Sequence, residues 1–407
     1  MKMLEEKEPE LNFDASTVRT ELDWARAGEA VFDAPVFITP IADVDNPDWY
    51  RKTGMPVAQD GTVPFARYVI REKGKVELGI GSCATCHTRV MPDGSIVKGA
   101  QGNVPIDRVL AFTYRARLGN DLVHFGERIR YVAPWLGSDD PGAKIAGMSR
   151  EEIASLHEAI PPGVQARHST SPFYPVQVPD LIGLKDRHFF DRTGMFLHRS
   201  TADLMRYAAL VQGVDVLARY GGFKLVNDLP DPKRFLRYSD AQLYALALYV
   251  YSLRPPPNPN HFDEAARRGE SVFKREGCDL CHTPPLYTNN KLTPAVGFKV
   301  PEDHLRRYDV FPVSVGTDPN LALKTRKGTG YYKVPSLKGV WYRGPFEHDG
   351  SVATLEDWFD RHRLDTDYVP TGFRGYGIKT RAVPGHRFGL DLSKEERQQL
   401  IAFLKTL

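Results

Sequence analysis

Long apolar runs are absent from this sequence of 407 residues: no segment approaches the roughly 18 consecutive apolar residues that would span a bilayer. The net charge is also small, at +3, and Lys and Arg are mixed evenly with Asp and Glu. The composition therefore predicts a protein without a membrane span and without a nucleic-acid surface. The composition gives no indication of the oligomeric state.

Cysteine is scarce, and all four residues fall in two copies of one motif. The first copy is Cys83-Ala84-Thr85-Cys86-His87, and the second is Cys278-Asp279-Leu280-Cys281-His282. Cys-x-x-Cys-His is the pattern that attaches haem c, because the thiols form thioethers with the porphyrin and the histidine gives iron an axial nitrogen. We therefore expect two covalent haem c groups, held by Cys83, Cys86, Cys278 and Cys281 and ligated by His87 and His282.

The alternatives for paired Cys-x-x-Cys motifs are a zinc ribbon and a redox dithiol. Zinc-binding pairs are usually about 15 to 20 residues apart, whereas Cys278 follows Cys86 after about 190 residues. Neither alternative explains a histidine directly after both pairs. Haem is therefore the favoured interpretation.

Haem attachment also predicts a location, because it is completed outside the cytoplasm. We expect a periplasmic protein. Residues 1–6, Met-Lys-Met-Leu-Glu-Glu, contain no apolar stretch of signal-peptide length. The export signal is therefore expected to have been removed.

The same order of sequence elements occurs twice. Residues 27–32 are echoed by residues 268–273, and the glycine in each would let another helix cross closely. Residues 178–184, Val-Pro-Asp-Leu-Ile-Gly-Leu, align without gaps on residues 334–340, Val-Pro-Ser-Leu-Lys-Gly-Val. Apolar periodicity after a capping serine predicts closing helices over residues 239–251 and 393–404.

These echoes predict two domains that divide near residue 260, where a proline-rich segment cannot continue a helix. Residues 1–260 would form an N-terminal cytochrome c-like domain, with an insertion over about 33–82. Residues 261–407 would form a C-terminal cytochrome c-like domain. The expected fold is mainly α, with each domain wrapped round one covalent haem and with long irregular loops, given 31 prolines and 34 glycines.

The segment Lys333–Val340, followed by Pro345–Ser351 and Leu355–Asp357, resembles the bacterial dihaem cytochrome c peroxidase superfamily. This superfamily includes the methylamine-utilisation dihaem enzyme and, distantly, the dihaem rubber oxygenases. The resemblance implies that the N-terminal haem reacts with hydrogen peroxide or dioxygen, while the C-terminal haem transfers electrons. A small redox protein or a small molecule would supply the electrons.

The resemblance also directs attention to the sixth ligand of the second iron. The family usually has a methionine beyond its His-Asp-Gly segment, but this chain has none after Met205. His362, fourteen residues past His348, takes that place in the sequence and is predicted as the ligand. A solvated basic face is the alternative for this charged stretch, and His304 and His386 are weaker ligand candidates. An imidazole instead of a thioether would lower the reduction potential.

Around the first haem, two family features are missing. No histidine lies between His87 and His124, where the peroxidases carry a distal histidine. Met205 and Arg206 stand where an acidic pair belongs, so general acid catalysis of peroxide cleavage is in question. We therefore expect an open face on this iron. His168 and His198, which flank the first repeat motif, are the remaining histidines to test.

Three further roles are implied by the family. Trp135 is the candidate electron relay between the haems, with a core aromatic as the alternative. His348 would hydrogen-bond a haem propionate or a loop carbonyl beside the reactive groups, with a structural histidine as the alternative. The calcium-binding Thr-Pro-Thr segment of the family reads Val334-Pro335-Ser336 here, which leaves side-chain ligation of calcium partly lost.

The leading function is therefore that of a peroxidase-like dihaem oxidoreductase. A haem-dependent oxygenase of the rubber-cleaving kind is the enzymatic alternative, favoured by an open first haem. A periplasmic electron carrier, with both irons closed, is the alternative that is not an enzyme.

Overall fold

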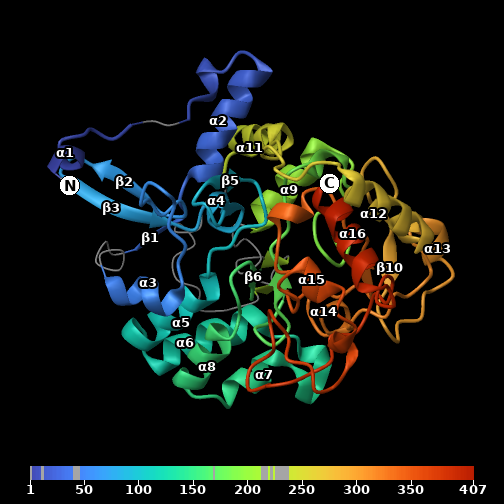
Figure 1. The fold of residues 1–407 in the computed structure, drawn as a ribbon. Coiled ribbons are helices and arrows are strands. Elements are labelled where there is room, and N and C mark those ends of the chain that lie inside the picture. Colours follow the sequence, from blue (N-terminus) through green and yellow to red (C-terminus); the bar gives the residue numbers. More distant parts are fainter. Residues whose placement is uncertain are drawn as a thin grey trace. The chain divides into compact units, whose positions relative to one another are not determined.

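The computed structural model describes residues 2–10, 13–39, 46–167, 170–211, 219–220, 223–224 and 238–407. The chain forms two compact units, and each takes in more than one stretch of sequence. Figure 1 shows the helices and strands, coloured along the sequence. Unit 1 comprises Met1–Thr113, Val178–Lys185 and His198–Arg254, and unit 2 comprises Tyr114–Gln177, Asp186–Leu197 and Pro255–Leu407. Each unit contains one Cys-x-x-Cys-His motif. Within the described residues, no helix has the length and apolarity needed to cross a membrane.

Helices dominate both units, and the strands are short. The α-helices are α1 (Lys2–Glu5), α2 (Glu21–Asp33), α3 (Pro47–Thr53), α4 (Cys83–Cys86), α5 (Ile106–Arg117), α6 (Asn120–Tyr131), α7 (Pro141–Ala146), α8 (Arg150–Glu158), α9 (Thr201–Ala209), α11 (Asp240–Ser252), α12 (Glu264–Arg275), α13 (His304–Arg307), α14 (Asn320–Leu323), α15 (Leu355–Trp358) and α16 (Lys394–Lys405). The 3-10 helices are η1 (Ala15–Thr17), η3 (Pro134–Asp139), η4 (Leu184–Asp186), η7 (Cys278–Leu280), η8 (Val340–Tyr342) and η9 (Arg361–Leu364).

The strands form small antiparallel sheets. The predicted insertion contains the sheet of three strands, in the order β1-β3-β2. The bounds are β1 (Phe37–Thr39), β2 (Arg67–Glu72), β3 (Lys75–Ile80), β4 (Thr88–Val90), β5 (Ile96–Lys98), β6 (Val164–Gln165), β7 (Val176–Gln177), β8 (Arg219–Tyr220), β9 (Phe223–Lys224), β10 (Leu292–Pro294) and β11 (Tyr331–Lys333). The fold is thus helical with small sheets, in agreement with the mainly α prediction.

A crossed pair of helices organises unit 1. Helix α2 begins with a capping box between Thr20 and Asp23 and packs against α11. At the crossing, a Cβ atom added to Gly28 would lie 1.9 Å from the carbonyl oxygen of Ala245 and 2.8 Å from Cβ of Tyr249. Only glycine allows this approach.

Unit 2 contains the same crossing, between α12 and α16. A Cβ atom added to Gly269 would lie 1.9 Å from the carbonyl oxygen of Gln399 and 2.8 Å from Cβ of Phe403. The predicted capping box of Ser393 and Glu396 starts α16. The repeat of first and closing helices, and the reason for its glycine, are therefore confirmed.

The second sequence echo also has one backbone conformation in both copies. Gly183 and Gly339 have φ values of 73° and 74°, and Gly194 and Gly350 have values of 70° and 72°. The gapless alignment of the two segments thus corresponds to a repeated turn.

Buried charges hold together the helices that follow the first haem motif. Glu127 of α6 is 1% exposed, and its carboxylate lies 2.7 Å from Nε2 of His157 and 3.1 Å from Nη1 of Arg130. The hydroxyl of Tyr114 donates to the same carboxylate. Burial by itself would raise the pKa of Glu127, but these partners outweigh it and lower the pKa to about 2.

The helix crossings predict that one methyl group added to either glycine would greatly lower the stability of the fold. We expect Gly28→Ala and Gly269→Ala each to lower the free energy of unfolding by about 1–3 kcal/mol or more, because the new Cβ overlaps backbone of the facing helix. Gly126→Ala is the control, since a Cβ there meets nothing within 4 Å in mid-helix α6. That control should gain about 1 kcal/mol in urea unfolding followed by circular dichroism. Equal stabilities for all three variants would contradict the crossing.

The buried ion pair predicts an acid-dependent stability. Glu127→Gln should cost about 3–5 kcal/mol at neutral pH, because His157 and Arg130 lose their buried counter-charge. The folded pKa of about 2 is below the ordinary value of 4.5, so this contribution is present above that ordinary value and is lost as the pH falls toward 2. Urea titrations at several pH values should show that the variant lacks this part of the acid dependence. Glu264→Gln, at a side chain that is 62% exposed, should change stability by less than about 1 kcal/mol.

Candidate haem sites

The first haem motif is a single helical turn in unit 1. Ser82 and Thr85 form a capping box that begins α4, and the amide of His87 donates to the carbonyl of Cys83 at 3.0 Å. The Nδ1 atom of His87 donates a hydrogen bond to the carbonyl oxygen of Pro179 at 3.0 Å. A carbonyl can only accept, so the proton is on Nδ1 and the lone pair is on Nε2. This is the form of imidazole that binds a metal.

The second motif repeats this arrangement in unit 2. The amide of His282 donates to the carbonyl of Cys278 at 2.8 Å. Its Nδ1 atom lies 3.1 Å from the carbonyl oxygens of both Pro335 and Tyr287. Pro335 is the counterpart of Pro179 in the second sequence echo. The repeat is visible in the sequence, but its role is visible only in the structure: its proline provides the carbonyl that orients each motif histidine.

The electrostatics of the second motif fit haem better than zinc. Burial lowers the pKa of His282 to about 4, so its imidazole is neutral near pH 7. Burial also raises the pKa of Cys278 to about 12 and raises the pKa of Cys281. Zinc binds thiolates, which this environment disfavours, whereas thioethers carry no charge.

A second imidazole lies next to His282. The ring centroids of His282 and His386 are 6.3 Å apart, and the planes are inclined by 52°. With nitrogens facing each other, rings at this spacing could each bind the same metal ion, since each metal–nitrogen bond is about 2 Å long and each ring centre is about 1 Å beyond its nitrogen. Burial lowers the pKa of His386 to about 3, and the nearby His282 contributes, so both rings are neutral donors.

The backbone of His386 is unusual for a residue with a side chain. Its φ is +44°, and the preceding Gly385 has a φ of +102°. Its Nδ1 atom is buried, and no hydrogen-bond partner for it lies in the part of the chain that the structure describes. A positive φ is energetically unfavourable for a residue other than glycine, and residues with this conformation are often found at functional sites. The loop therefore holds an imidazole in a place that it would not adopt by local preference.

The predicted ligand His362 lies elsewhere in unit 2. Its side chain is 51% exposed, and Nδ1 is 2.9 Å from the carboxylate of Asp365. The hydrogen bond to Asp365 raises the pKa of His362, which favours a charged surface imidazolium. Ligation by His362 remains a prediction. The structure places His386, a weaker candidate in the sequence, beside the proximal histidine.

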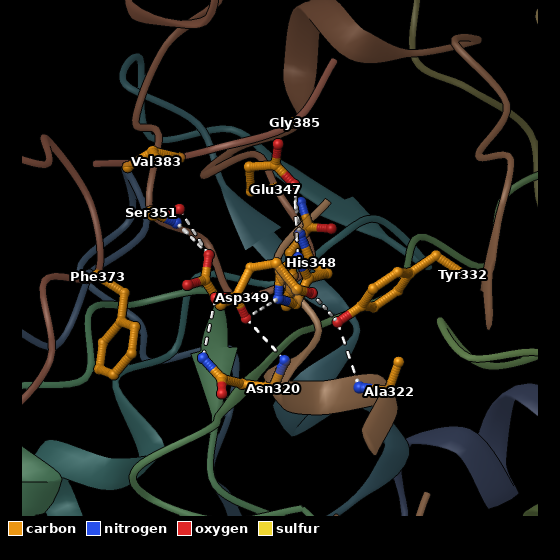
Figure 2. A network of polar contacts seen from close by, with 12 residues as sticks. Asn320, Ala322, Tyr332, Glu347, His348, Asp349, Ser351, Phe373, Val383 and Gly385 are labelled. Atoms are coloured by element: carbon orange, nitrogen blue, oxygen red, sulfur yellow. Dashed lines mark hydrogen bonds and ion pairs between the residues drawn. The ribbon is translucent and has the colours of Figure 1, made fainter. Parts of the chain in front are cut away.

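His348 is 9% exposed and belongs to a network of charged groups in unit 2 (Figure 2). The carboxylate of Glu347 is 3.5 Å from its Nδ1, and that of Asp318 is 3.8 Å from its Nε2. The ring of Tyr332 lies against it, with centroids 4.7 Å apart. Burial would lower the pKa of His348, but the surrounding carboxylates raise it overall. The side chain is thus paired with acids, and a part in catalysis remains a prediction.

Trp135 and the predicted calcium segment are the remaining predicted features. Trp135 of η3 is 62% exposed, so its part in electron relay remains a prediction. For the calcium segment, the carbonyl of Val334 accepts a hydrogen bond from Thr288, and the hydroxyl of Ser336 donates to the carbonyl of Leu286. Calcium binding remains an expectation.

The described histidines of the first half have protein partners. Nε2 of His198 lies 2.6 Å from the hydroxyl of Tyr251, and His157 pairs with Glu127. His124 contacts two backbone carbonyls, and His188 lies 3.2 Å from the carboxylate of Asp309. His168 lies outside the described residues.

The loop after His87 folds back on the first motif. The amide of Gly99 donates to the carbonyl of His87 at 2.6 Å, and that of Gly102 donates to the carbonyl of Cys86 at 3.1 Å. A Cβ atom on Gly102 would lie 2.1 Å from this carbonyl oxygen. Between these glycines, Gln101 is 1% exposed. The loop that lacks a histidine is therefore packed tightly against the motif.

Comparison with known proteins identifies relatives in one group. The methylamine utilization protein MauG of Methylorubrum extorquens is 31% identical over 143 residues, which is 35% of this chain and 34% of that protein. The cytochrome-c peroxidase IdrP1 of Denitromonas iodatirespirans is 26% identical over 161 residues, covering 35% and 40% of the two chains. IdrP1 of a Pseudomonas species is 27% identical over 171 residues, covering 36% and 41%. The matches thus span between about a third and two fifths of these relatives, and no family model matches the chain.

Solved structures give a weaker likeness. Hydrazine synthase of Kuenenia stuttgartiensis has a TM-score of 0.37 and 17% identity, over 74% of this chain and 92% of that chain. A MauG-like protein associated with microbial copper homeostasis has a TM-score of 0.35 and 17% identity, over 72% and 89%. At these TM-scores, the sequence relatives carry the evidence of kinship.

The two motifs predict the cofactor content. Intact-mass spectrometry in acid and denaturant should find two haem additions per chain, because thioether bonds survive unfolding. Replacing both Cys278 and Cys281 with alanine should leave one addition, and replacing both Cys83 and Cys86 should leave the other. A single haem in the unaltered protein, or bound zinc, would contradict the assignment.

Proposed function

We propose that this chain, which its motifs and relatives link to the dihaem cytochrome c peroxidase superfamily, is a periplasmic dihaem oxidoreductase. The observation that best supports the proposal is the repeated site. In both copies, the motif histidine donates from Nδ1 to the carbonyl of a proline, Pro179 or Pro335, at an equivalent position. Haem iron supplies electron transfer and, where an axial position is open, binding of peroxide or dioxygen.

The C-terminal site is proposed to transfer electrons. His282 and His386 would provide the two imidazole nitrogens that bind the second iron, and His386 would fill the role that the sequence predicts for His362. Two neutral imidazoles bound to one iron would leave it no vacant position for a substrate. They also favour a lower reduction potential than a histidine and a methionine would.

The N-terminal site is proposed to react with hydrogen peroxide or dioxygen. His87 would provide the proximal nitrogen, and the tight loop around Gln101 carries no histidine. His198, which flanks the repeat motif, is hydrogen-bonded to Tyr251. Among the described residues, which do not include His168, these observations favour a first iron that has no histidine on its distal side. A small redox protein or a small molecule would supply the electrons.

Ligand binding separates the proposed roles. In the reduced wild-type protein, we expect one carbon monoxide per chain, because the second iron is closed by His386. His386→Ala should bind two and should lose a low-spin signal in electron paramagnetic resonance of the oxidised protein, with free imidazole restoring that signal. His362→Ala is the matched control and should behave like the wild type.

Two outcomes would contradict this assignment. A low-spin signal that survives in His386→Ala but disappears in His362→Ala would return the ligand to His362. No carbon monoxide at either iron in the wild type would mean that both irons are closed, and a simple electron carrier would then replace the enzyme.

A further inference from the structure

Arg363 is a buried cation in unit 2, and its exposed fraction is 0%. It follows His362 in η9, but it points into the protein, whereas His362 lies at the surface. An isolated charge inside a protein is strongly unfavourable unless polar groups surround it. The groups that surround Arg363 therefore indicate what its burial achieves.

Backbone carbonyls take up the guanidinium hydrogens. Nη1 donates to the carbonyl of Val383 at 2.7 Å, and Nη2 donates to the carbonyls of Gly385 at 2.9 Å and His386 at 2.8 Å. In return, the amide of Val383 donates to the carbonyl of Arg363 at 2.6 Å. Three carbonyls in four consecutive residues thus converge on one side chain. These residues carry the imidazole that lies beside His282.

The same guanidinium also supports the surroundings of the imidazole ring. Its Nε donates to the carbonyl of Trp358 at 2.9 Å, and its central carbon lies 5.4 Å from the centre of the indole ring. The Trp358 ring in turn packs edge to face against the His386 ring, with centroids 5.4 Å apart. Arg363 therefore contacts both the backbone of the loop and the aromatic side chain that packs against His386.

The loop needs this support because its local conformation is unfavourable. His386 has a positive φ, and a residue with a side chain keeps such a conformation only when neighbouring groups enforce it. One further tether is the amide of His386, which donates to the carbonyl of Val315 at 2.6 Å. The planar fork of arginine can bind several carbonyls at fixed angles, which the single ammonium of lysine cannot do.

We propose that Arg363 is a positioning residue that holds His386 in place as the sixth ligand of the C-terminal iron. This inference rests on the proposed function, in which His386 is that ligand. Arg363 acts through the loop and does not contact the iron. Without it, the loop could relax toward its preferred backbone, and the imidazole would be displaced more easily by an external ligand.

The test uses the full-length dihaem protein with Arg363→Met, which keeps most of the volume, and Arg363→Lys, which keeps the charge. Arg361→Met is the matched control, because Arg361 lies two residues away with a side chain that is 72% exposed. Electron paramagnetic resonance reports the spin state of the oxidised C-terminal haem, and a cyanide titration reports how easily its ligand is displaced. Thermal unfolding, recorded in parallel, identifies the temperature range in which each variant is folded.

We expect both Arg363 variants, while folded, to show a partly high-spin C-terminal haem. They should also bind cyanide there about tenfold or more tightly than the wild type, because the loss of one hydrogen bond from a charged donor corresponds to a change in affinity of about that size. Free imidazole should restore the low-spin signal. Arg361→Met should match the wild type in all three measurements.

The proposal fails if a folded Arg363→Met protein keeps the wild-type spin state and cyanide affinity, because the residue then serves stability alone. If Arg363→Met does not fold, Arg363→Lys decides by the same criteria. His386→Ala distinguishes the two levels of the argument: a lost low-spin signal there, together with unchanged Arg363 variants, refutes only the positioning role. An unchanged signal in His386→Ala refutes the ligand and the positioning role together.

Discussion

The hydrogen bond from Nδ1 of each motif histidine to a prolyl carbonyl is the constraint on which both sites depend. A histidine that follows two cysteines could adopt either tautomer and many ring orientations. The carbonyls of Pro179 and Pro335 remove this freedom by accepting the Nδ1 proton, which leaves Nε2 as the donor atom. The proline-containing turn, its positive-φ glycines and the crossed helices are all repeated in the two copies, so the site and the fold repeat together.

Two of the buried charged side chains in unit 2 are stabilised in different ways. Glu127 keeps its charge because His157 and Arg130 offset it within a hydrogen-bonded network. Arg363 keeps its charge among backbone carbonyls that belong to a strained loop. In the first case the charges join helices, and in the second they fix the position of one imidazole. Both arrangements are costly to interrupt, because removing one partner leaves the other buried without compensation.

The repeat also shows how one architecture can serve two different sites. The motif turn, the acceptor proline and the helix crossing are shared. So is a following loop whose amide donates to the carbonyl of the second motif cysteine, at 3.1 Å from Gly102 to Cys86 and at 2.7 Å from Asn289 to Cys281. In the second copy, the loop around Gly385 brings His386 beside His282. In the first, the loop that follows the motif carries no histidine. The proposed division between a reactive and an electron-transferring haem rests on this difference.

Features that depend on local spacing can be predicted from the sequence alone. The Cys-x-x-Cys-His motif uses residues that are neighbours in the sequence. The glycines at the helix crossings recur at matching positions, and a capping serine marks the start of each closing helix. Contacts between residues far apart in the sequence, in contrast, are visible only in the folded chain. The spacing from His348 predicts His362 as a ligand, and this stays a prediction. An irregular loop has no fixed period, so spacing alone does not tell which side chain points inward. In this loop Arg363 turns into the protein, His362 turns to solvent, and His386, more than twenty residues further on, reaches the proximal histidine because backbone contacts hold it in a conformation that its own sequence does not favour.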